Sequence, residues 1–273
     1  MPDCDNNCSS CGVEGCPSRS QADFHVDANP LSNVKKVIAV VSGKGGVGKS
    51  LTTSLLAVNA RRDGKAVAII DADVTGPSIP KAFGLHGMAK ANETTIFPVT
   101  SKTGIEAMSL NLLTDDETAP VIWRGPVISG LIKQFWTDVA YGDIDELYID
   151  MPPGTGDVPL TVFQSLPVNG IIIVTSPQDL VDLIVEKAVN MAKMMNIPIL
   201  GIVENMSSYI CPCCGETIYP FGQSSLAIAN KFGIELTDSL PIDSKLAKLV
   251  DEGNIEDYEG RYLDSITQAI HNL

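Results

Sequence analysis

The chain lacks the features that place a protein in a membrane or on nucleic acid. The uncharged stretch at residues 160–178 is interrupted by Pro167 and Pro177 and carries polar side chains, so it is not expected to span a bilayer. Basic residues are scarce, since 19 Lys and Arg stand against 33 Asp and Glu and leave a net charge of −14. Such an acidic chain is a poor candidate for replacing counterions along nucleic acid, and anionic lipid repels it. We therefore expect neither nucleic acid nor a membrane as a partner.

Aromatic residues are few, and a secretory signal is missing. Only 5% of the residues are Phe, Trp or Tyr, so aliphatic side chains must fill the core, and an apolar content of 44% is ample for this. Residues 1–21 are polar and have no apolar central run of the kind a signal peptide needs. We expect a cytoplasmic protein with reduced thiols, in which clustered cysteines bind metal or do redox chemistry more often than they form disulfides.

The order of apolar segments predicts an α/β fold with a mostly parallel central sheet flanked by helices. Strands are expected at residues 34–42, 65–71, 146–151, 170–176 and 199–204. Helices are expected at residues 49–62, 127–139, 180–195 and 258–273. Residues 1–33 are predicted to be a Cys-rich flexible extension, and residues 34–273 a single domain with ligands at the carboxyl ends of its strands.

A phosphate-binding loop follows the first expected strand. Residues 43–50 read GKGGVGKS and match G-x-x-x-x-G-K-[ST], placed between a buried strand and a helix. Glycines let successive backbone N–H groups turn inwards as an anion nest, and the following helix presents its positive end. Lys49 can reach the β- and γ-phosphates, and the Ser50 hydroxyl can ligate Mg²⁺. The predicted nucleotide-contacting residues here are Gly43, Lys44, Gly45, Gly46, Val47, Gly48, Lys49, Ser50 and Leu51.

Carboxylates end two of the expected strands. IIDAD places Asp71 and Asp73 at the end of one strand, and LYIDMPPGTGD places Asp150 at the end of another. An Asp after an apolar strand can be an ordinary helix cap, but in P-loop enzymes it holds Mg²⁺ or its water. Beside the phosphate loop, the magnesium interpretation is favoured.

The cysteines stand in two groups, separated by a stretch without any, residues 17–210. In CPCCG, at residues 211–215, Cys211 and Cys214 lie at i and i+3 around a proline-containing turn and can bind one metal centre together. From the spacing alone, structural zinc and an iron–sulfur cluster are equally supported. A centre with four protein ligands needs two more besides these thiolates, and a second copy of the chain is a natural source of them. Cys213 is a spare ligand, a transfer thiol or a bystander.

The N-terminal group follows a C-x3-C-x2-C-x4-C spacing. Four thiolates on a flexible leader can bind a second [4Fe–4S] cluster or zinc, and metal binding is favoured over free thiols. The four residues are Cys4, Cys8, Cys11 and Cys16.

Taken together, the motifs resemble one family, the Mrp/ApbC-type iron–sulfur cluster carrier ATPases, within the deviant Walker A P-loop NTPases. The resemblance covers residues 34–273, and its motifs occur in the family's order. They are KGGxGK at the phosphate loop, DADVTGPS, WRGP, DMPPGTGD, GIVENMS and CP-x-CG.

The resemblance implies a role for each matching residue. Lys44 would reach into the nucleotide site of a homodimer partner. Asp73 would orient or activate the attacking water, with Asp71 nearer the magnesium shell, and Asp150 would sense the γ-phosphate. Asn205 would contact adenine. Cys211 and Cys214 of two chains would hold one bridging [4Fe–4S] cluster, which moves the interpretation of CPCCG from zinc to iron–sulfur.

The implied function is that of a weak ATPase, using ATP and Mg²⁺, that carries a cluster to apo iron–sulfur proteins. An alternative is a positioning ATPase of the MinD or ParA type with a structural zinc knuckle, but no basic face or membrane helix is evident in the sequence. A nucleotide-dependent electron donor like the nitrogenase iron protein would also bridge a cluster between subunits, but its full motif set is absent.

Overall fold

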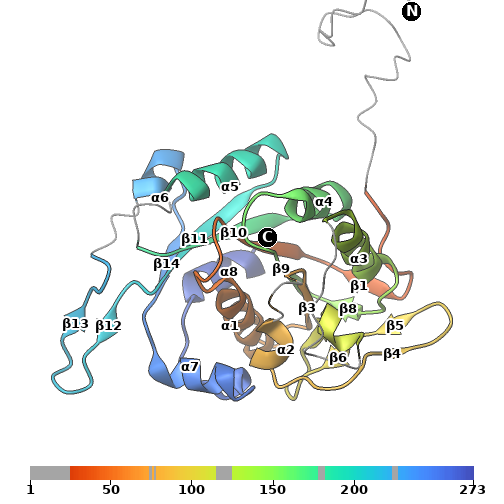
Figure 1. The fold of residues 1–273 in the computed structure, drawn as a ribbon, viewed down its shortest axis with the longest axis horizontal. Coiled ribbons are helices and arrows are strands. Elements are labelled where there is room, and N and C mark those ends of the chain that lie inside the picture. The colour runs from red at the N-terminus through yellow and green to blue at the C-terminus, as the bar shows by residue number, and fades with distance from the viewer. Residues whose placement is uncertain (1–24, 74–75, 77, 115–124, 178–181, 223–226) are drawn as a thin grey trace, which may run out of the picture.

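The computed structural model describes residues 25–73, 76, 78–114, 125–177, 182–222 and 227–273. In these residues the centre of the protein is an eight-stranded sheet (Figure 1). Neighbouring strands run parallel, except for the antiparallel pair of β6 and β7 at one edge. From edge to edge the strands are β14 (Thr237–Leu240), β11 (Ile199–Asn205), β10 (Gly170–Thr175), β2 (Val37–Ser42), β9 (Glu146–Asp150), β3 (Val67–Asp71), β7 (Glu106–Met108) and β6 (Val99–Thr100).

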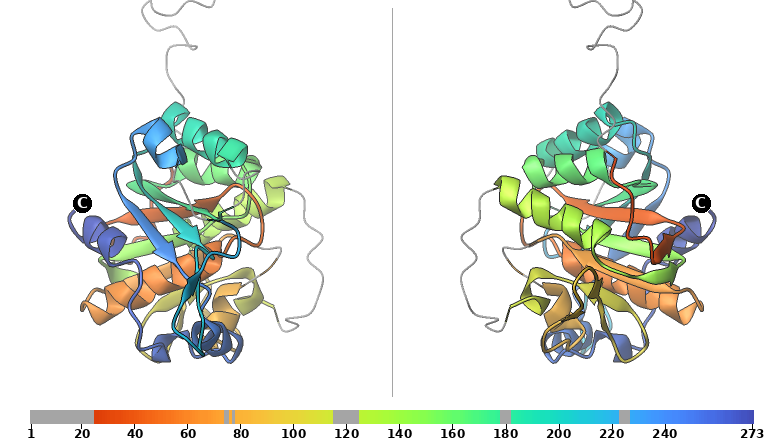
Figure 2. Two further views of the ribbon diagram at one scale, coloured as in Figure 1. Left: turned by 90° about the vertical axis from the view of Figure 1, so that its left-hand side faces the viewer. Right: turned by 90° about the vertical axis from the view of Figure 1, so that its right-hand side faces the viewer.

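Helices cover both faces of the sheet, so the chain forms three layers (Figures 1 and 2). One face carries α1 (Lys49–Arg62), α2 (Ser78–Ala82), α7 (Ser244–Asp251) and α8 (Asp264–His271). The other carries α3 (Gly125–Thr137), α4 (Asp157–Ser165), α5 (Asp182–Met194) and α6 (Ala227–Phe232). This arrangement confirms the predicted α/β fold with a mostly parallel sheet flanked by helices.

The strand β2 shows why these sequences form central strands. Every residue of VIAVVS is buried. Ile38 and Val40 belong to the core under α1, whereas Ala39 and Val41 belong to the core on the other face. Because side chains alternate between faces along a strand, a continuously apolar run suits only a strand that is covered on both sides.

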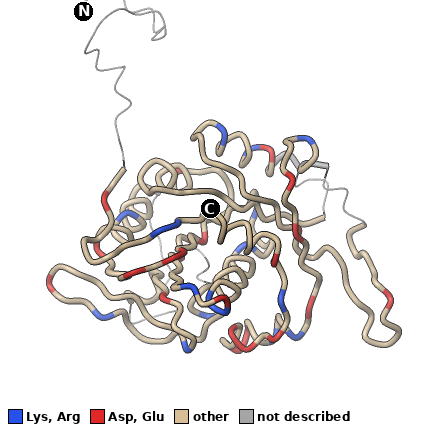
Figure 3. Tube along the Cα trace, turned by 180° about the vertical axis from the view of Figure 1, so that it is seen from behind, with Lys and Arg blue, Asp and Glu red and all other residues tan. Residues whose placement is uncertain are grey.

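Short elements complete the described chain. They are β1 (Ser32–Val34) with β8 (Gly142–Ile144), β4 (Lys90–Ala91) with β5 (Ile96–Phe97), β12 (Tyr209–Ile210) with β13 (Thr217–Ile218), and the 3₁₀ turns η1 (Leu110–Leu112) and η3 (Ile255–Asp257). Charged residues of both signs are scattered over helices and loops in the described trace (Figure 3). None of the helices in the described ranges has both the length and the apolar character to cross a bilayer.

Two predicted elements differ from the observed ones. The strand expected over residues 34–42 is divided, because Val34 pairs with Ile144 in β1 and β8, and β2 starts only at Val37. The helix expected over residues 258–273 begins at Asp264 instead. The segment before it is held away from the helix, because the hydroxyl of Tyr258 donates to Asp243 Oδ2 at 2.7 Å.

The N-terminal cysteines lie outside the described residues, so the predicted extension is described only from residue 25 onwards. That part contacts the domain: Val26 N donates to the carbonyl of Ser165, and the indole of Trp136 donates to the carbonyl of Val26, both at 3.0 Å. The domain boundary at residue 33 stays a prediction.

Candidate nucleotide site and thiol hairpin

The phosphate loop has the backbone conformation that its glycines allow. Gly46 and Gly48 have φ angles of 78° and 87°, in the left-handed region. A Cβ atom at Gly48 would also lie 2.0 Å from Nδ2 of Asn205. The loop leads directly into α1, so its backbone N–H groups and the helix amino end face the same space. This is the geometry of an anion site.

Lys49 joins the loop to the strand-end carboxylates. Its Nζ lies 2.8 Å from Oδ1 of Asp150 and 3.6 Å from Oδ2 of Asp73. The Ser50 hydroxyl donates to Oδ2 of Asp150 at 2.6 Å. Asp150 is fully buried, and only 6% of Lys49 is exposed. The structure therefore brings together the lysine, the hydroxyl and two of the three carboxylates that the sequence singled out.

Asp71 differs from its neighbours. It is paired in register with Asp150 on the adjacent strand, and 1% of it is exposed. Burial, and then repulsion from Asp150, raises the pKa of Asp71 well above its usual range, against the opposing effect of Lys49. Its Oδ2 lies 3.2 Å from the hydroxyl of Ser109. The hydroxyl donates this bond, and the backbone N–H of Asp73 donates to Oδ1 of Asp71 at 3.2 Å.

The loop and Asp73 border a cavity of about 510 Å³. Predicted residues that line it are Gly45, Gly46, Gly48, Lys49, Ser50, Leu51, Asp73 and Asn205. Lys44 is half-exposed within the loop between Gly43 and Gly45, Val47 is buried, and Asp71 and Asp150 are buried at the strand ends. Backbone N–H groups and a lysine suit phosphates, and a hydroxyl beside carboxylates suits Mg²⁺. The residues present fit a nucleotide with its metal ion.

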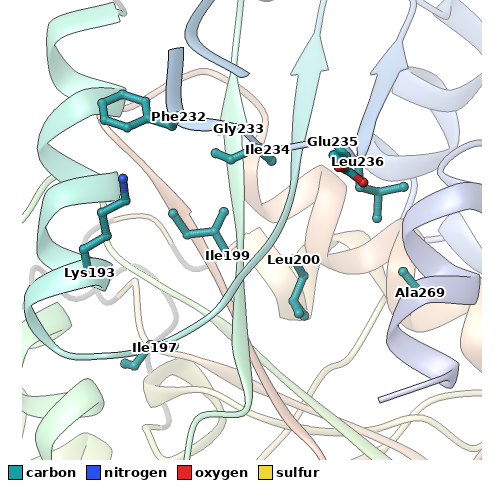
Figure 4. Close-up of a pocket in the computed structure, with 10 residues that line it drawn as sticks. All are labelled: Lys193, Ile197, Ile199, Leu200, Phe232, Gly233, Ile234, Glu235, Leu236 and Ala269. Carbon is teal, nitrogen blue, oxygen red and sulfur yellow. The ribbon is translucent and has the colours of Figure 1, made fainter. Parts of the chain in front are cut away.

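A larger cavity, of about 690 Å³, lies at the amino end of β11 (Figure 4). Aliphatic side chains from β11 and from the segment before β14 line it, with Lys193 and Glu235 as its charged residues. Its lining has no glycine-rich loop that leads into a helix. It lies at the opposite end of β11 from Asn205, which contacts the phosphate loop. The chemistry of its lining therefore does not suit a triphosphate.

Asn205 connects the nucleotide cavity to the second cysteine group. Its side-chain Nδ2 donates to the carbonyl of Val47 at 2.9 Å. Met206, the next residue, has a φ of 57° and lines the same cavity. Ser207 then bonds to the carbonyl of Leu240 through its backbone N–H at 3.0 Å and its hydroxyl at 3.1 Å. The chain therefore leaves the phosphate loop along a constrained path.

This path leads into the thiol hairpin, which we define as residues 209–218, with β12 and β13 as its strands. The loop closes through two backbone bonds, from Cys211 N to Glu216 O and from Gly215 N to Cys211 O, both 2.9 Å. Cys211 is half-buried, and Cys213 and Cys214 are exposed. Backbone N–H groups of Cys214 and then Cys213 lower the pKa of the Cys211 thiol. A thiolate is the form that binds metal.

Sequence reasoning missed several residues that complete these sites. Thr53 Oγ1 lies 2.9 Å from Oδ1 of Asp150, and Ser109 contacts Asp71. Met206 and Val250 line the nucleotide cavity. Thr53 could have been found, since it stands four residues after Lys49 on the predicted helix and so shares its face. Val250 lies in α7, about two hundred residues after Lys49, and nothing in its local sequence indicates that it lines this cavity.

One chain alone does not assemble a full metal site in the parts that the structure describes. There, no three Cys, His, Asp or Glu side chains converge as a metal-binding group. The thiol hairpin therefore offers two or three thiols on a loop open to solvent, and the predicted cluster ligands Cys211 and Cys214 are both accessible there.

Comparisons with known proteins identify relatives of this chain. Residues 33–273 match the ParA family model described as NUBPL iron-transfer P-loop NTPase. The iron–sulfur cluster carrier protein of Methanocaldococcus jannaschii is 44% identical over 260 residues, which are 93% of this chain and 90% of that protein. A nucleotide-binding protein of Archaeoglobus fulgidus, solved in complex with ADP, is 45% identical, with a TM-score of 0.76 over 85% of this chain and 91% of that one.

The fold also resembles that of the cell-division protein MinD. The MinC–MinD complex of Aquifex aeolicus contains a chain with a TM-score of 0.60 over 87% of this chain and 94% of that one, at 18% identity. Likeness at this level concerns the fold alone. The positioning ATPase considered from the sequence thus has no support beyond the shared architecture.

Proposed function

Because the chain belongs to the ParA family of NUBPL-type iron-transfer P-loop NTPases, we propose that it is an iron–sulfur cluster scaffold and carrier. It binds a [4Fe–4S] cluster as cargo, binds and slowly hydrolyses ATP, and transfers the cluster to apo iron–sulfur proteins. One observation carries this proposal: the thiol hairpin begins four residues after Asn205, whose side chain is bonded to the phosphate loop.

The phosphate loop supplies the nucleotide half of the activity. Backbone N–H groups of residues 45–49 and the amino end of α1 face the phosphates, and Lys49 exchanges its contact with Asp150 for phosphate oxygens. Ser50, with Asp150 and Asp73 near it, would hold Mg²⁺, which neutralises phosphate charge when it is bound. Asp73, 14% exposed at the cavity, is placed to orient the attacking water, and Lys44 would complete the site of a second copy.

The thiol hairpin supplies the cluster half. The Cys211 thiolate, stabilised by backbone N–H groups, and the exposed Cys214 provide two of the four ligands that a [4Fe–4S] cluster needs. Equivalent thiols of a second copy provide the other two, so the working form is a homodimer. Cys4, Cys8, Cys11 and Cys16 hold a second cluster or zinc.

ATP acts as a switch on the cluster rather than as a source of rapid turnover. Contacts to the γ-phosphate draw the loops after Asp73 and Asp150 into one arrangement, and hydrolysis releases them. Asn205 contacts both the phosphate loop and the path to the hairpin, so nucleotide occupancy changes how far the cluster is exposed. The protein acts in the cytoplasm, and neither nucleic acid nor a membrane takes part.

Anaerobic reconstitution with ferrous iron and sulfide tests this function. Wild type, Cys211→Ser and Cys213→Ser are compared for bound iron, and then for transfer to an apo-ferredoxin with ATP, with ADP and without nucleotide. We expect loss of the transferable cluster in Cys211→Ser and retention in Cys213→Ser, which is the matched control on the same loop. If iron binding and transfer survive in Cys211→Ser, the assignment of the hairpin is wrong. Equal transfer rates with and without nucleotides would remove the switch.

A further inference from the structure

Thr53 is a buried threonine of α1 whose hydroxyl contacts the carboxylate of Asp150. It stands four residues after Lys49 and three after Ser50, so the three side chains share one face of the helix. The hydroxyl lies 2.9 Å from Oδ1 of Asp150 and 3.0 Å from the backbone carbonyl of Lys49. Thr53 and Asp150 are both 0% exposed. The contact is therefore shielded from water, where a hydrogen bond to a charged group is strong.

A threonine hydroxyl has one hydrogen, so Thr53 donates to one of these two acceptors at a time. The carbonyl of Lys49 already accepts the backbone N–H of Thr53 in the regular pattern of the helix. A buried carboxylate loses more free energy than such a carbonyl when a donor is missing, because the carboxylate is charged. The hydroxyl hydrogen of Thr53 is therefore donated to Asp150.

The neighbours of Thr53 on α1 share its contact with the helix backbone but not its contact with Asp150. The hydroxyls of Thr52, Thr53 and Ser54 each lie within hydrogen-bond distance of the carbonyl four residues earlier, at 3.0, 3.0 and 2.8 Å. Of the three, only Thr53 also contacts a carboxylate within the described part of the chain. A role that depends on Asp150 is thus particular to Thr53.

Asp150 accepts from three side chains, and two of them also contact the nucleotide or its metal ion in the proposed function. Lys49 Nζ lies 2.8 Å from Oδ1, and the Ser50 hydroxyl lies 2.6 Å from Oδ2. Lys49 exchanges its contact for phosphate oxygens, and Ser50 turns to Mg²⁺. Thr53 is fully buried and is not among the described residues that line the nucleotide cavity, so it keeps its contact with Asp150.

We propose that Thr53 is the positioning residue for Asp150 in ATP hydrolysis. The inference rests on the proposed function, because it concerns the reaction at that nucleotide site. The Thr53 hydroxyl holds Oδ1, so the other oxygen, Oδ2, stays directed to the hydroxyl of Ser50, which would bind Mg²⁺. Without Thr53, the carboxylate loses the donor that stays in place after Lys49 and Ser50 have turned to the nucleotide, and its orientation is lost.

Substitutions at Thr53 separate the effect of the hydroxyl from that of the rest of the side chain. Thr53→Val replaces the hydroxyl with a methyl group, Thr53→Ala removes both branches, and Thr53→Ser keeps the hydroxyl. Thr52→Val is the matched control, because Thr52 is equally buried on the same helix and its hydroxyl bonds to the carbonyl of Gly48 instead. If Thr53→Val does not fold, Thr53→Ser and Thr53→Ala decide in its place.

Two measurements on the full chain test the proposal. Steady-state kinetics gives kcat and KM for ATP, and calorimetry gives the ADP dissociation constant without Mg²⁺ and over a range of Mg²⁺ concentrations. We expect kcat to fall at least about tenfold in Thr53→Val and Thr53→Ala, with KM within about threefold of wild type. The Mg²⁺ concentration that half-saturates the effect on ADP binding should rise in the same two variants.

The remaining variants and conditions should match wild type. Thr53→Ser keeps the donor, and Thr52→Val leaves Asp150 untouched. Without Mg²⁺, the Ser50 hydroxyl still donates to Asp150, so ADP affinity measured without the metal should be unchanged in all variants. A merely structural role of Thr53 would instead lower ADP affinity with and without Mg²⁺ alike.

Equal losses in Thr53→Val and Thr52→Val overturn the inference, and so does a loss in Thr53→Ser as large as that in Thr53→Ala. Wild-type kcat and Mg²⁺ dependence in Thr53→Val overturn it as well, as does an equal fall in ADP affinity with and without Mg²⁺. In each case the proposed function stands if the wild type hydrolyses ATP and iron is lost in Cys211→Ser. A wild type that neither binds nor hydrolyses ATP removes the nucleotide half of the proposed function and this inference with it.

Discussion

The side-chain amide of Asn205 donates to the backbone carbonyl of Val47 at 2.9 Å. This bond links Asn205, the last residue of β11, to the middle of the phosphate loop. Asn205 is six residues before Cys211 in the sequence. The acceptor of the bond is a backbone atom of the loop that is expected to surround phosphates. We therefore expect a nucleotide that reshapes the loop to act on Asn205 and, through the segment bonded at Ser207, on the hairpin.

Replacement of Asn205 by Ala removes this link. We expect the rate of cluster transfer to become the same with ATP and with ADP, whereas the wild-type rates differ. Transfer to an apo-ferredoxin, followed by the absorbance of the acceptor, measures this. Asn33→Ala is the control, because Asn33 bonds to Asp143 at the surface, at 3.0 Å, away from the site. A persistent difference between ATP and ADP in Asn205→Ala would show that the coupling takes another route.

Gly48→Ala tests the conformation of the loop. Gly48 has a φ of 87°, which a residue with a side chain rarely adopts, and an added Cβ would lie 2.0 Å from Nδ2 of Asn205. We therefore expect ATP affinity to fall by more than about tenfold. Gly64→Ala is matched to it, with a φ of 80° and no atom within 4 Å of its Cβ. That control should lose about 1 kcal/mol of stability and keep its ATP affinity. Calorimetric titration with ATP measures both, and equal affinities would contradict the collision.

Asp71→Asn tests the protonation of the buried carboxyl. An acid with a raised folded-state pKa contributes stability that is fully present below its unfolded value of 3.8 and is lost as pH rises. We therefore expect the free energy of unfolding of Asp71→Asn, relative to wild type, to increase between about pH 4 and pH 8, since Asn cannot ionise. Urea unfolding at a series of pH values, without nucleotide, measures it. A difference in unfolding free energy that does not change with pH would contradict the raised pKa of Asp71.

The Cys211 thiol should react at lower pH than an ordinary cysteine. The largest causes of its lowered pKa are the backbone N–H groups of Cys214 and Cys213. The lowered pKa should therefore persist when both neighbouring thiols are replaced by serine. In Cys213→Ser/Cys214→Ser, with Cys4, Cys8, Cys11 and Cys16 also changed to serine, the pH midpoint of iodoacetamide labelling should lie below the midpoint of the same protein unfolded in urea. The same protein in urea is the control, because unfolding removes the loop. Identical midpoints in the two states would rule out the backbone effect.

The C-terminal helix is anchored by His271, which lies between two carboxylates. Its Nδ1 is 2.6 Å from Glu146 Oε1 and its Nε2 is 3.1 Å from Asp63 Oδ2. Glu146 is buried and also accepts from Tyr148 at 2.7 Å. Removing the imidazole leaves these acceptors short of a donor, so His271→Ala should cost about 1–3 kcal/mol of unfolding free energy. Gln268→Ala, at an exposed position of the same helix, is the control, and equal thermal stability of the two variants would contradict the anchoring role.

The motifs of the proposed nucleotide site could be recognised in the sequence because their signals are local. Gly48 and Lys49 lie in one short motif, and α1 begins at Lys49 as expected. Asp71 and Asp150 end apolar strands, and parallel strands bring their carboxyl ends to the same edge of a sheet. The family comparison confirms the resemblance drawn from these motifs. The individual roles of the site residues, and those of the N-terminal cysteines, stay predictions.

What the sequence could not predict depends on contacts between distant segments. Tyr258 bonds to Asp243, and this contact keeps the chain extended where its periodicity indicated the start of a helix. The strand order brings Asp71 beside Asp150 in a buried environment, and this environment raises the pKa of Asp71.

The sequence by itself determined the phosphate loop, the strand-end carboxylates and the two thiols of CPCCG, because each depends on residue types at short spacings. Only the tertiary structure decided that Asn205 contacts Val47, that Val250 of α7 lines the cavity, and that the apolar residues beside the thiols are exposed. These depend on how segments up to two hundred residues apart pack together, and burial is a property of the folded chain.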